Sequence, residues 1–282
     1  MGASIYLGKS LSAGTKGCNI MLPSTPSYDP DAVAFFTAAG ITDTTQKTAV
    51  NQLVLDLKSY NIWNKMKAIY PFVGGTATTH KYNLKNPLDT DAAFRIVFNG
   101  GWTHNSNGIT PNGTNGYADT KLSPSGVLTL NNTHISLYSR TNNAVAGADF
   151  ANAESGGRTM GFNIKWSDNN GYYDMYNQST NRITYSMAST NSTGLFVNNR
   201  TSNVVHNIWR NGGKLSTNTN TQSGTLTTLN LFIAAQNASA GIAYYTNRNY
   251  SFASIGDGLS DTEAANFYTA VQAFQVALSR NI

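Results

Sequence analysis

The chain has 282 residues, 40% of them hydrophobic and 11% aromatic, which is enough apolar material to bury a core. Only 12% of the residues are charged, against about 25% in an average soluble protein, and no apolar run reaches the roughly 18 residues that cross a bilayer, so we expect neither a coiled coil nor membrane insertion. The net charge of +5 arises from 19 basic and 14 acidic residues without a basic stripe, which argues against nucleic-acid binding.

Residues 1–28 are rich in glycine and small side chains and show neither helical nor strand periodicity. They predict an arm, with two short apolar groups at 5–7 and 20–22 that could order against a partner. A basic region followed by an apolar stretch is missing, so we expect no secretory signal. The single cysteine, Cys18, predicts a fold without an internal disulfide.

Residues 29–66 predict a helical segment packed on the rest of the molecule. Asp29 and Pro30 are typical of a helix start, and Gly40 of its end. A second helix begins near Asp43, with Gln46 at the spacing of a capping box. Its apolar positions recur at steps of three and four, namely Val50, Leu53, Leu57 and Tyr60.

From about residue 67 the apolar period changes to two, which indicates half-buried strands. Three alternating sets carry this pattern: Phe94, Ile96 and Phe98; Met160, Phe162, Ile164 and Trp166; Ile183, Tyr185 and Met187. Residues 133–139, 204–210 and 230–235 are further candidate strands, and Asn211-Gly212 predicts a tight hairpin. The polar segments 115–125, 141–158 and 216–228 predict loops.

A last helix is predicted after Ser260, which stands three residues before Glu263 as in a capping box. Its apolar side chains are Ala264, Phe267, Val271, Phe274 and Leu278. The predicted fold is therefore mainly β, an antiparallel β-sandwich over residues 67–282 with two N-terminal helices and one C-terminal helix.

Catalytic residues are not predicted. A glycan-acting hydrolase needs paired carboxylates, but of the two glutamates Glu263 is explained as a cap and Glu154 lies in a predicted loop as a solvated side chain. Aspartate pairs remain as an alternative, namely Asp89 with Asp91 and Asp168 with Asp174. No motif for a nucleophile elbow, a phosphate loop or a zinc protease occurs.

The four histidines, His80, His104, His134 and His206, are far apart in the sequence and lack a ligand partner at helical or strand spacing. We therefore predict no metal site and no cofactor. His206 alternates with Val204 and Ile208, which favours a hydrogen-bonded histidine in the core.

Ligand binding is a separate matter. Trp102 and His104 follow Gly100-Gly101, and Tyr172 and Tyr173 follow Gly171, so aromatic rings stand at predicted loop edges where sugars could stack. The alternative is that these rings cover the ends of the sheets.

Several segments resemble known modules. Residues 252–263, with the sequence FASIGDGLSDTE, look like the closing strand, turn and C-terminal helix of laminin-G/concanavalin-A-like jelly rolls. Residues 209–212 resemble their Asn-Gly hairpin, and 230–235 the following strand, although Ala235 departs from a commoner glycine pattern. Residues 69–75 and 112–120 are similar to modules of tailed-bacteriophage virion proteins.

The resemblance covers about residues 29–282 and implies a role as a non-enzymatic virion structural protein, displayed on the head as a fibre or decoration or on the tail. It implies attachment to other virion proteins through the arm, a homodimer or homotrimer, host-surface glycans as ligands, and assembly into virions in the host cytoplasm. Some relatives use calcium, but no cluster of Asp and Asn matches a metal site, so no ligands are carried over.

Overall fold

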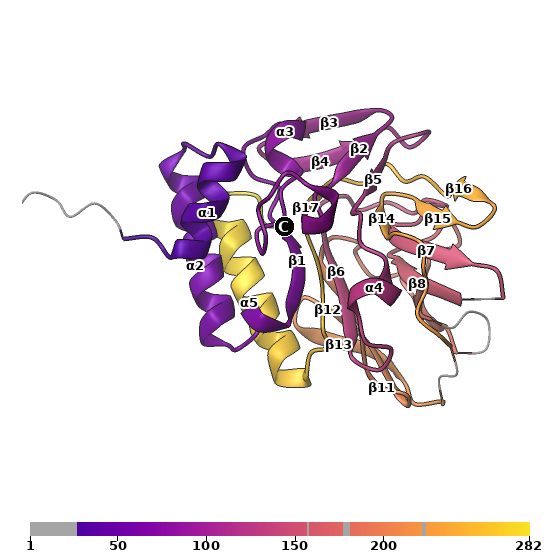
Figure 1. Ribbon diagram of the computed structural model, residues 1–282. Helices are drawn as coiled ribbons and strands as arrows, with labels where there is room; N and C mark the ends of the chain where they lie inside the picture. The colour runs from indigo at the N-terminus through magenta and orange to yellow at the C-terminus, as the bar shows by residue number, and fades with distance from the viewer. Residues whose placement is uncertain (1–26, 157, 177–180, 222–223) are drawn as a thin grey trace, which may run out of the picture.

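The computed structural model describes residues 27–156, 158–176, 181–221 and 224–282 and has three layers (Figure 1). A layer of helices covers one face of a first sheet, and a second sheet covers its other face. The predicted arm lies outside the described residues except for Ser27 and Tyr28. Tyr28 already belongs to the folded body, because its ring packs edge-on against Phe36 at 5.4 Å between centroids.

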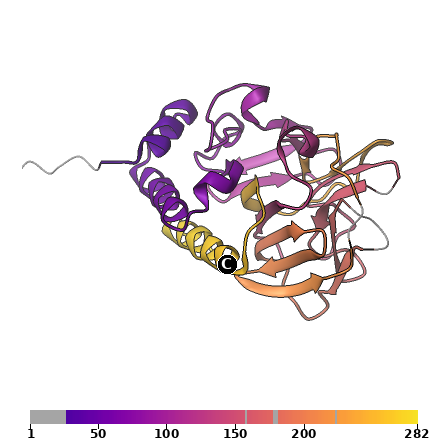
Figure 2. The same cartoon turned by 60° about the horizontal axis from the view of Figure 1, so that its bottom comes forward.

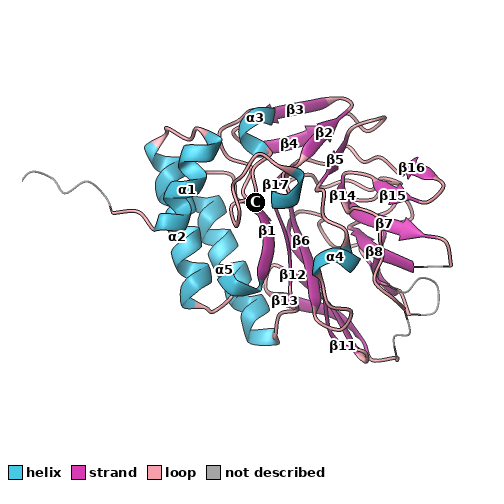
Figure 3. Ribbon diagram, viewed as in Figure 1, coloured by secondary structure: helices cyan, strands magenta, loops and turns pink. Residues whose placement is uncertain are grey.

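The helical layer consists of α1 (Pro30–Ala39), α2 (Thr44–Ser59) and α5 (Asp261–Ala277), the two ends of the described chain lying side by side (Figures 2 and 3). Asp29 caps α1, and Gly40 ends it with a φ of 66°. Both halves of the predicted capping box at Ser260 and Glu263 are formed. Within the described ranges, every helix is too short or too polar to span a lipid bilayer.

Of the two hydrogen bonds in the capping box predicted at Asp43, only one is formed. The Asp43 carboxylate accepts the Gln46 N–H at 2.8 Å, as expected for a cap. The Gln46 side chain, however, accepts the Gly74 N–H at 2.8 Å instead of returning to the cap. It thereby ties the start of α2 to the loop after the first strand.

Sheet A lies between the helices and sheet B. Its strands are, in spatial order, β13 (Gly213–Asn218), β12 (Val205–Arg210), β11 (Gly194–Ser202), β6 (Thr133–Ser139), β17 (Tyr250–Gly256), β4 (Gly108–Pro111) and β3 (Trp102–Asn105), with β1 (Met66–Tyr70) also beside β17. The hairpin between β12 and β13 is confirmed at Asn211 and Gly212, whose φ angles of 49° and 74° are those of a type I′ turn.

Sheet B forms the outer layer. Its strands are β10 (Ile183–Ser186), β9 (Asn170–Met175), β8 (Arg158–Asn163), β7 (Phe150–Glu154), β14 (Phe232–Ile233), β5 (Tyr117–Asp119) and β2 (Val97–Asn99), with β15 (Gln236–Ala238) beside β7 and β16 (Gly241–Ala243) beside β15. The predicted antiparallel sandwich is confirmed, and among the described strands only β15 and β7 pair in parallel.

Short helices lie in the connections. They are η1 (Trp63–Lys65), α3 (Ala77–His80), η2 (Asp91–Ala93) and α4 (Pro124–Val127).

Two cores follow from this layering, because sheet A is buried on both faces. On β6 and β17, Tyr138 and Phe252 face the helices, whereas their neighbours Leu137 and Ala253 face sheet B. The C-terminal helix packs on both α2 and sheet A, with Phe274 buried in the helical core.

Several sequence-based boundaries are wrong. The predicted loops 115–125 and 141–158 contain β5, β7 and the start of α4, and 216–218 continue β13. Phe94 does not join β2, because it ends η2 in the left-handed region with a φ of 59°. In β7, Asn152 and Glu154 are buried polar residues. Asn152 donates to the Leu229 carbonyl, and Glu154 accepts the Thr228 and Leu229 N–H groups. Because polar residues are buried here, β7 lacks the apolar alternation that would have predicted a strand.

Candidate functional site

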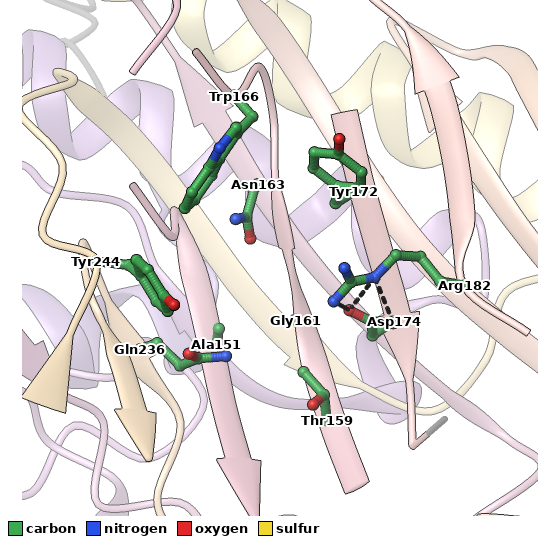
Figure 4. A pocket seen from close by; sticks show the side chains of 10 residues that line it. All are labelled: Ala151, Thr159, Gly161, Asn163, Trp166, Tyr172, Asp174, Arg182, Gln236 and Tyr244. Atoms are coloured by element: carbon green, nitrogen blue, oxygen red, sulfur yellow. Dashed lines mark hydrogen bonds and ion pairs between the residues drawn. The ribbon is translucent and has the colours of Figure 1, made fainter. Parts of the chain in front are cut away.

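A pocket of about 300 Å³ lies on the outer face of sheet B, across β7, β8 and β9 (Figure 4). The alternation of side chains along each strand shows on which face of sheet B the pocket lies. Phe150, Phe162 and Tyr173 point into the core between the sheets, so their strand neighbours point outward. The helices α1, α2 and α5 lie on sheet A, on the side of the molecule away from this face (Figure 1).

The floor of the pocket is a row of residues in register across four strands. Gln236 pairs with Ala151, Ala151 with Gly161, and Gly161 with Asp174. A Cβ on Gly161 would lie 2.5 Å from the Ala151 Cβ, so only glycine fits. The two small residues leave backbone as the floor, with room above it for a ligand.

Three aromatic rings form the walls (Figure 4). Trp166 stands in the turn between β8 and β9, Tyr172 points outward from β9, and Tyr244 follows β16 and is 51% exposed. The Trp166 ring lies 5.4 Å from that of Tyr244 and 6.4 Å from that of Tyr172, edge to face in both cases. Flat apolar surfaces of this kind suit the C–H faces of a ring-shaped ligand.

Polar groups occupy the remaining walls. Arg182 donates to Asp174 from Nε and Nη2, the latter at 2.6 Å, and the guanidinium lies 5.3 Å from the centroid of the Tyr172 ring. Burial raises the pKa of Asp174 to about 6, against the hydrogen bonds from Arg182, which lower it. Asn163 and Gln236 add neutral amides, which both donate and accept hydrogen bonds.

A buried ion pair holds the backbone next to the rim of the pocket. Arg248 and Asp149 are both fully buried and 3.0 Å apart. Asp149 accepts the Ile164 N–H at 2.6 Å, and Arg248 donates to the Lys165 carbonyl at 2.6 Å, so the pair holds the backbone that leads into Trp166. The Ala148 N–H donates to the Tyr244 carbonyl, which connects the second ring to the same cluster.

Of the four aromatic residues predicted as ligand contacts, Tyr172 lines the pocket. Tyr173, its neighbour, is fully buried, because alternation along β9 turns it into the core, and we do not retain it as a ligand contact. Trp102 and His104 lie on β3 of sheet A, outside the pocket. They pack with Phe98 of β2 at 5.2 and 4.6 Å, so they close the side of the sandwich between β3 and β2, the edge strands of the two sheets.

The fold brings two of the distant histidines together. His80 Nδ1 lies 3.0 Å from His104 Nδ1, and His80 Nε2 accepts the Gly75 N–H. Burial lowers the pKa of His80 to about 3, so this ring is neutral at physiological pH. His206 is a buried core histidine bonded to Asn198 at 2.6 Å, in agreement with the sequence analysis. Across the described part of the chain, no three His, Cys, Asp or Glu side chains gather as metal ligands.

The candidate carboxylates differ in their burial and in their hydrogen-bond partners. Glu154 is not a solvated loop residue but a buried residue of β7, and its Oε1 accepts from Thr228 and from the Leu229 N–H. Asp89 and Asp91 are exposed and paired with Lys81 and Arg95. Asp174 lines the pocket, and Asp168 accepts the Tyr172 hydroxyl at its rim.

Sequence reasoning missed Trp166, Tyr244, Arg182 and Gln236. The period-two pattern extended to Trp166 and implied an inward ring, but β8 ends at Asn163. The polar run 167–170 after Trp166 was the available turn signal. Nothing near Tyr244 or Gln236 indicated that their hairpin would come to lie beside β7.

The fold is a jelly-roll β-sandwich, and known structures share it. One is botulinum neurotoxin type C, whose cell entry depends on interaction with two ganglioside molecules, with 12% identity, a TM-score of 0.52, 76% of this chain covered and 53% of that one. A second is the binding domain of botulinum neurotoxin DC in complex with rat synaptotagmin II, with 12% identity, a TM-score of 0.50 and coverage of 75% and 53%.

A third is a mutant of Trypanosoma rangeli sialidase that displays trans-sialidase activity, with 8% identity, a TM-score of 0.55, and 80% of this chain and 39% of that one covered. The chain thus spans about half the length of the neurotoxin chains and less of the sialidase. No family model and no curated protein sequence matches the chain. At these identities, the likeness establishes the fold alone.

Proposed function

We propose that the protein is a lectin-like module that binds a glycan in the pocket on sheet B and does not cleave it. The observation that carries this proposal is the arrangement of Trp166, Tyr172 and Tyr244 around a floor of backbone, with neutral amides beside them. Aromatic faces suit the apolar faces of sugar rings, and amides suit their hydroxyls. Sugar-related ligands or substrates among proteins of the same fold support the proposal by analogy.

Binding without catalysis is supported by the state of the carboxylates. Among the described residues that line the pocket, Asp174 alone carries a carboxyl group, and Arg182 holds it on both oxygens. Glycoside hydrolysis generally uses two carboxylates that flank the scissile bond. The competing hydrolase would therefore need Asp168 as the partner of Asp174, although Asp168 accepts the Tyr172 hydroxyl.

Replacing Trp166 by alanine is expected to weaken glycan binding by about tenfold or more, as for a central aromatic contact. The measurement is binding of the purified protein to a panel of oligosaccharides, followed by calorimetry on those that bind. Trp102→Ala is the matched control, because Trp102 packs at the end of sheet A, and it should leave affinity unchanged. Loss of binding in Trp102→Ala with normal binding in Trp166→Ala would contradict the proposed site.

The same panel tests for catalysis. Release of shorter sugars by the wild-type protein, abolished by Asp174→Asn or Asp168→Asn, would overturn the non-enzymatic assignment. Loss of turnover in Glu154→Gln would be less informative, because Glu154 holds the Thr228 and Leu229 backbone.

We further propose that the module is displayed on a bacteriophage particle, on the capsid or the tail, and is assembled there in the host cytoplasm. The resemblance of residues 69–75 and 112–120 to virion modules supports this setting, as does the position of the N-terminal end of the body. The described chain enters at α1, whereas the pocket opens on sheet B, with sheet A between them (Figure 1). An arm anchored to other virion proteins on the helical side, in a homodimer or homotrimer, would leave the pocket facing the host glycans.

A protein truncated to begin at Tyr28 should fold and bind glycan normally but fail to enter virions. It keeps the contact between Tyr28 and Phe36, so the body is complete. The measurement is the amount of the protein in purified particles, with the full chain as control. Truncated protein that is incorporated at normal occupancy would show that the arm is not the anchor.

A further inference from the structure

We infer that the pocket selects neutral sugars over sugars that carry a carboxylate, because its arginine is already neutralised by its own aspartate. This inference rests on the proposed function and specifies the ligand class of the same site. A free arginine is the usual means of recognising a carboxylate, through two parallel hydrogen bonds. Here the pocket contains the arginine together with an internal carboxylate that occupies it.

Arg182 directs one edge of its guanidinium, formed by Nε and Nη2, at Asp174. Its Nε lies 3.0 Å from both oxygens of Asp174, and its Nη2 lies 2.6 Å from Oδ2. The Asp174 side chain is 5% exposed and cannot turn to solvent, and the Tyr172 ring flanks the guanidinium. A ligand carboxylate that takes the Nε–Nη2 edge would have to displace Asp174 and leave that carboxylate buried without a partner, which is costly. The Nη1 group has no hydrogen-bond partner among the described residues, but Asp174 already balances the charge of the guanidinium.

The charges around the pocket also disfavour an anion. Asp174 and Arg182 cancel within the lining, and Asp168 adds a negative charge beside Tyr172. The hydrogen bond from the Tyr172 hydroxyl lowers the pKa of Asp168, so Asp168 is ionised at neutral pH. Lys165 of the same turn directs its amine to the Thr190 carbonyl and does not line the pocket.

Two neutral side chains face the pocket beside this ion pair. In the described structure, the side-chain amides of Asn163 and Gln236 face the pocket without a hydrogen-bond partner in the protein (Figure 4). An amide offers both a donor and an acceptor and so matches a sugar hydroxyl, which also does both. Two such amides, on β8 and β15, flank the floor and provide hydroxyl recognition without net charge.

The test compares a neutral with an acidic probe in two pairs. Cellotetraose is compared with the β-1,4-linked tetraglucuronate, in which a carboxylate replaces each hydroxymethyl group, and lactose with 3′-sialyllactose, which adds one carboxylate-bearing sialic acid residue. Affinities are measured at pH 7.5, where Asp174 is ionised, for the wild-type protein and for Asp174→Asn. The wild-type protein should prefer the neutral member of the pair that it binds. Asp174→Asn releases Arg182 and gives the lining a net positive charge, so the ratio of acidic to neutral affinity should rise about tenfold.

Asp168→Asn is the control, because it removes the same charge from the rim without touching Arg182, and it should change the ratio far less. If Asp174→Asn does not fold, the affinities of the wild-type protein for the neutral and acidic probes still test the inference. Tighter wild-type binding of an acidic member, lost in Trp166→Ala, would overturn the inference and leave the proposed function standing. Absence of binding to every probe would contradict both.

Discussion

Replacing Arg248 by methionine is expected to lower the free energy of unfolding by about 3–5 kcal/mol, the range for removing one partner of a buried ion pair. The substitution leaves Asp149 fully buried, with hydrogen bonds from Ile164 N–H and the Tyr250 hydroxyl but no positive charge. It also removes one donor from each of the Asn143 and Lys165 carbonyls, which accept from Arg248 at 3.0 and 2.6 Å. Each carbonyl keeps one longer hydrogen bond, from Ser192 Oγ and from the Val145 N–H respectively, both at 3.2 Å. Urea unfolding measures the loss.

Arg95→Met is the matched control. Arg95 makes ion pairs with Asp89 and Asp91 on the surface, where such pairs contribute about 0–1 kcal/mol. Because the Arg248 pair holds the backbone before Trp166, the Arg248 variant should also bind glycan more weakly at a temperature where it is folded. Equal free energies of unfolding for the two variants would show that the buried ion pair does not stabilise the fold more than a surface pair does.

Replacing Phe274 by alanine is expected to cost about 3–5 kcal/mol, the range for emptying a buried aromatic site. Phe274 is 2% exposed, packs against Phe252 of β17 with 6.3 Å between ring centroids, and lies beneath the guanidinium of Arg280. The helical layer would lose its central contact with sheet A. Chemical denaturation measures the change.

Ser260→Ala gives the comparison on the same helix, because it removes only the cap at the start of α5 and should cost about 1 kcal/mol. Two small and equal effects would mean that α5 is not packed as described. A large effect confined to Ser260 would mean that the cap, and not the apolar face, holds this helix.

The helices were predictable because their signals are local. The capping interactions of Asp29, Gly40 and Ser260 lie within one helical turn. The apolar steps of three and four at Phe267, Val271 and Phe274 require only that an apolar surface cover them. The hairpin at Asn211 and Gly212 is local in the same sense, since two positive φ angles define its turn.

The strands of sheet B were less predictable because their partners decide their burial. The Glu154 carboxylate pairs locally with Arg158, but its Oε1 accepts from Thr228 and Leu229, more than seventy positions later. Likewise, the fold of the sheet places Gln236 beside Ala151. Polar residues with distant partners lack the alternation on which a sequence-based prediction of strands depends.

The candidate site depends both on local sequence signals and on contacts between distant segments. The sequence singled out Tyr172, yet it paired this residue with Tyr173, which faces the core. The pocket itself depends on register, since Gly161 lies between Ala151 and Asp174 in one row across three strands. Spacing along a single strand cannot reveal such a row.

The central claim is that a glycan binds on sheet B beside Trp166. The chain has four tryptophans, Trp63, Trp102, Trp166 and Trp209, so the indole N–H signals of ¹⁵N-labelled protein report on four separate places. Titration with an oligosaccharide that binds should shift the Trp166 signal, identified by its absence in Trp166→Ala, and leave the other three in place. A shift of the Trp102 signal with an unmoved Trp166 signal would contradict the account and place the ligand at the end of sheet A.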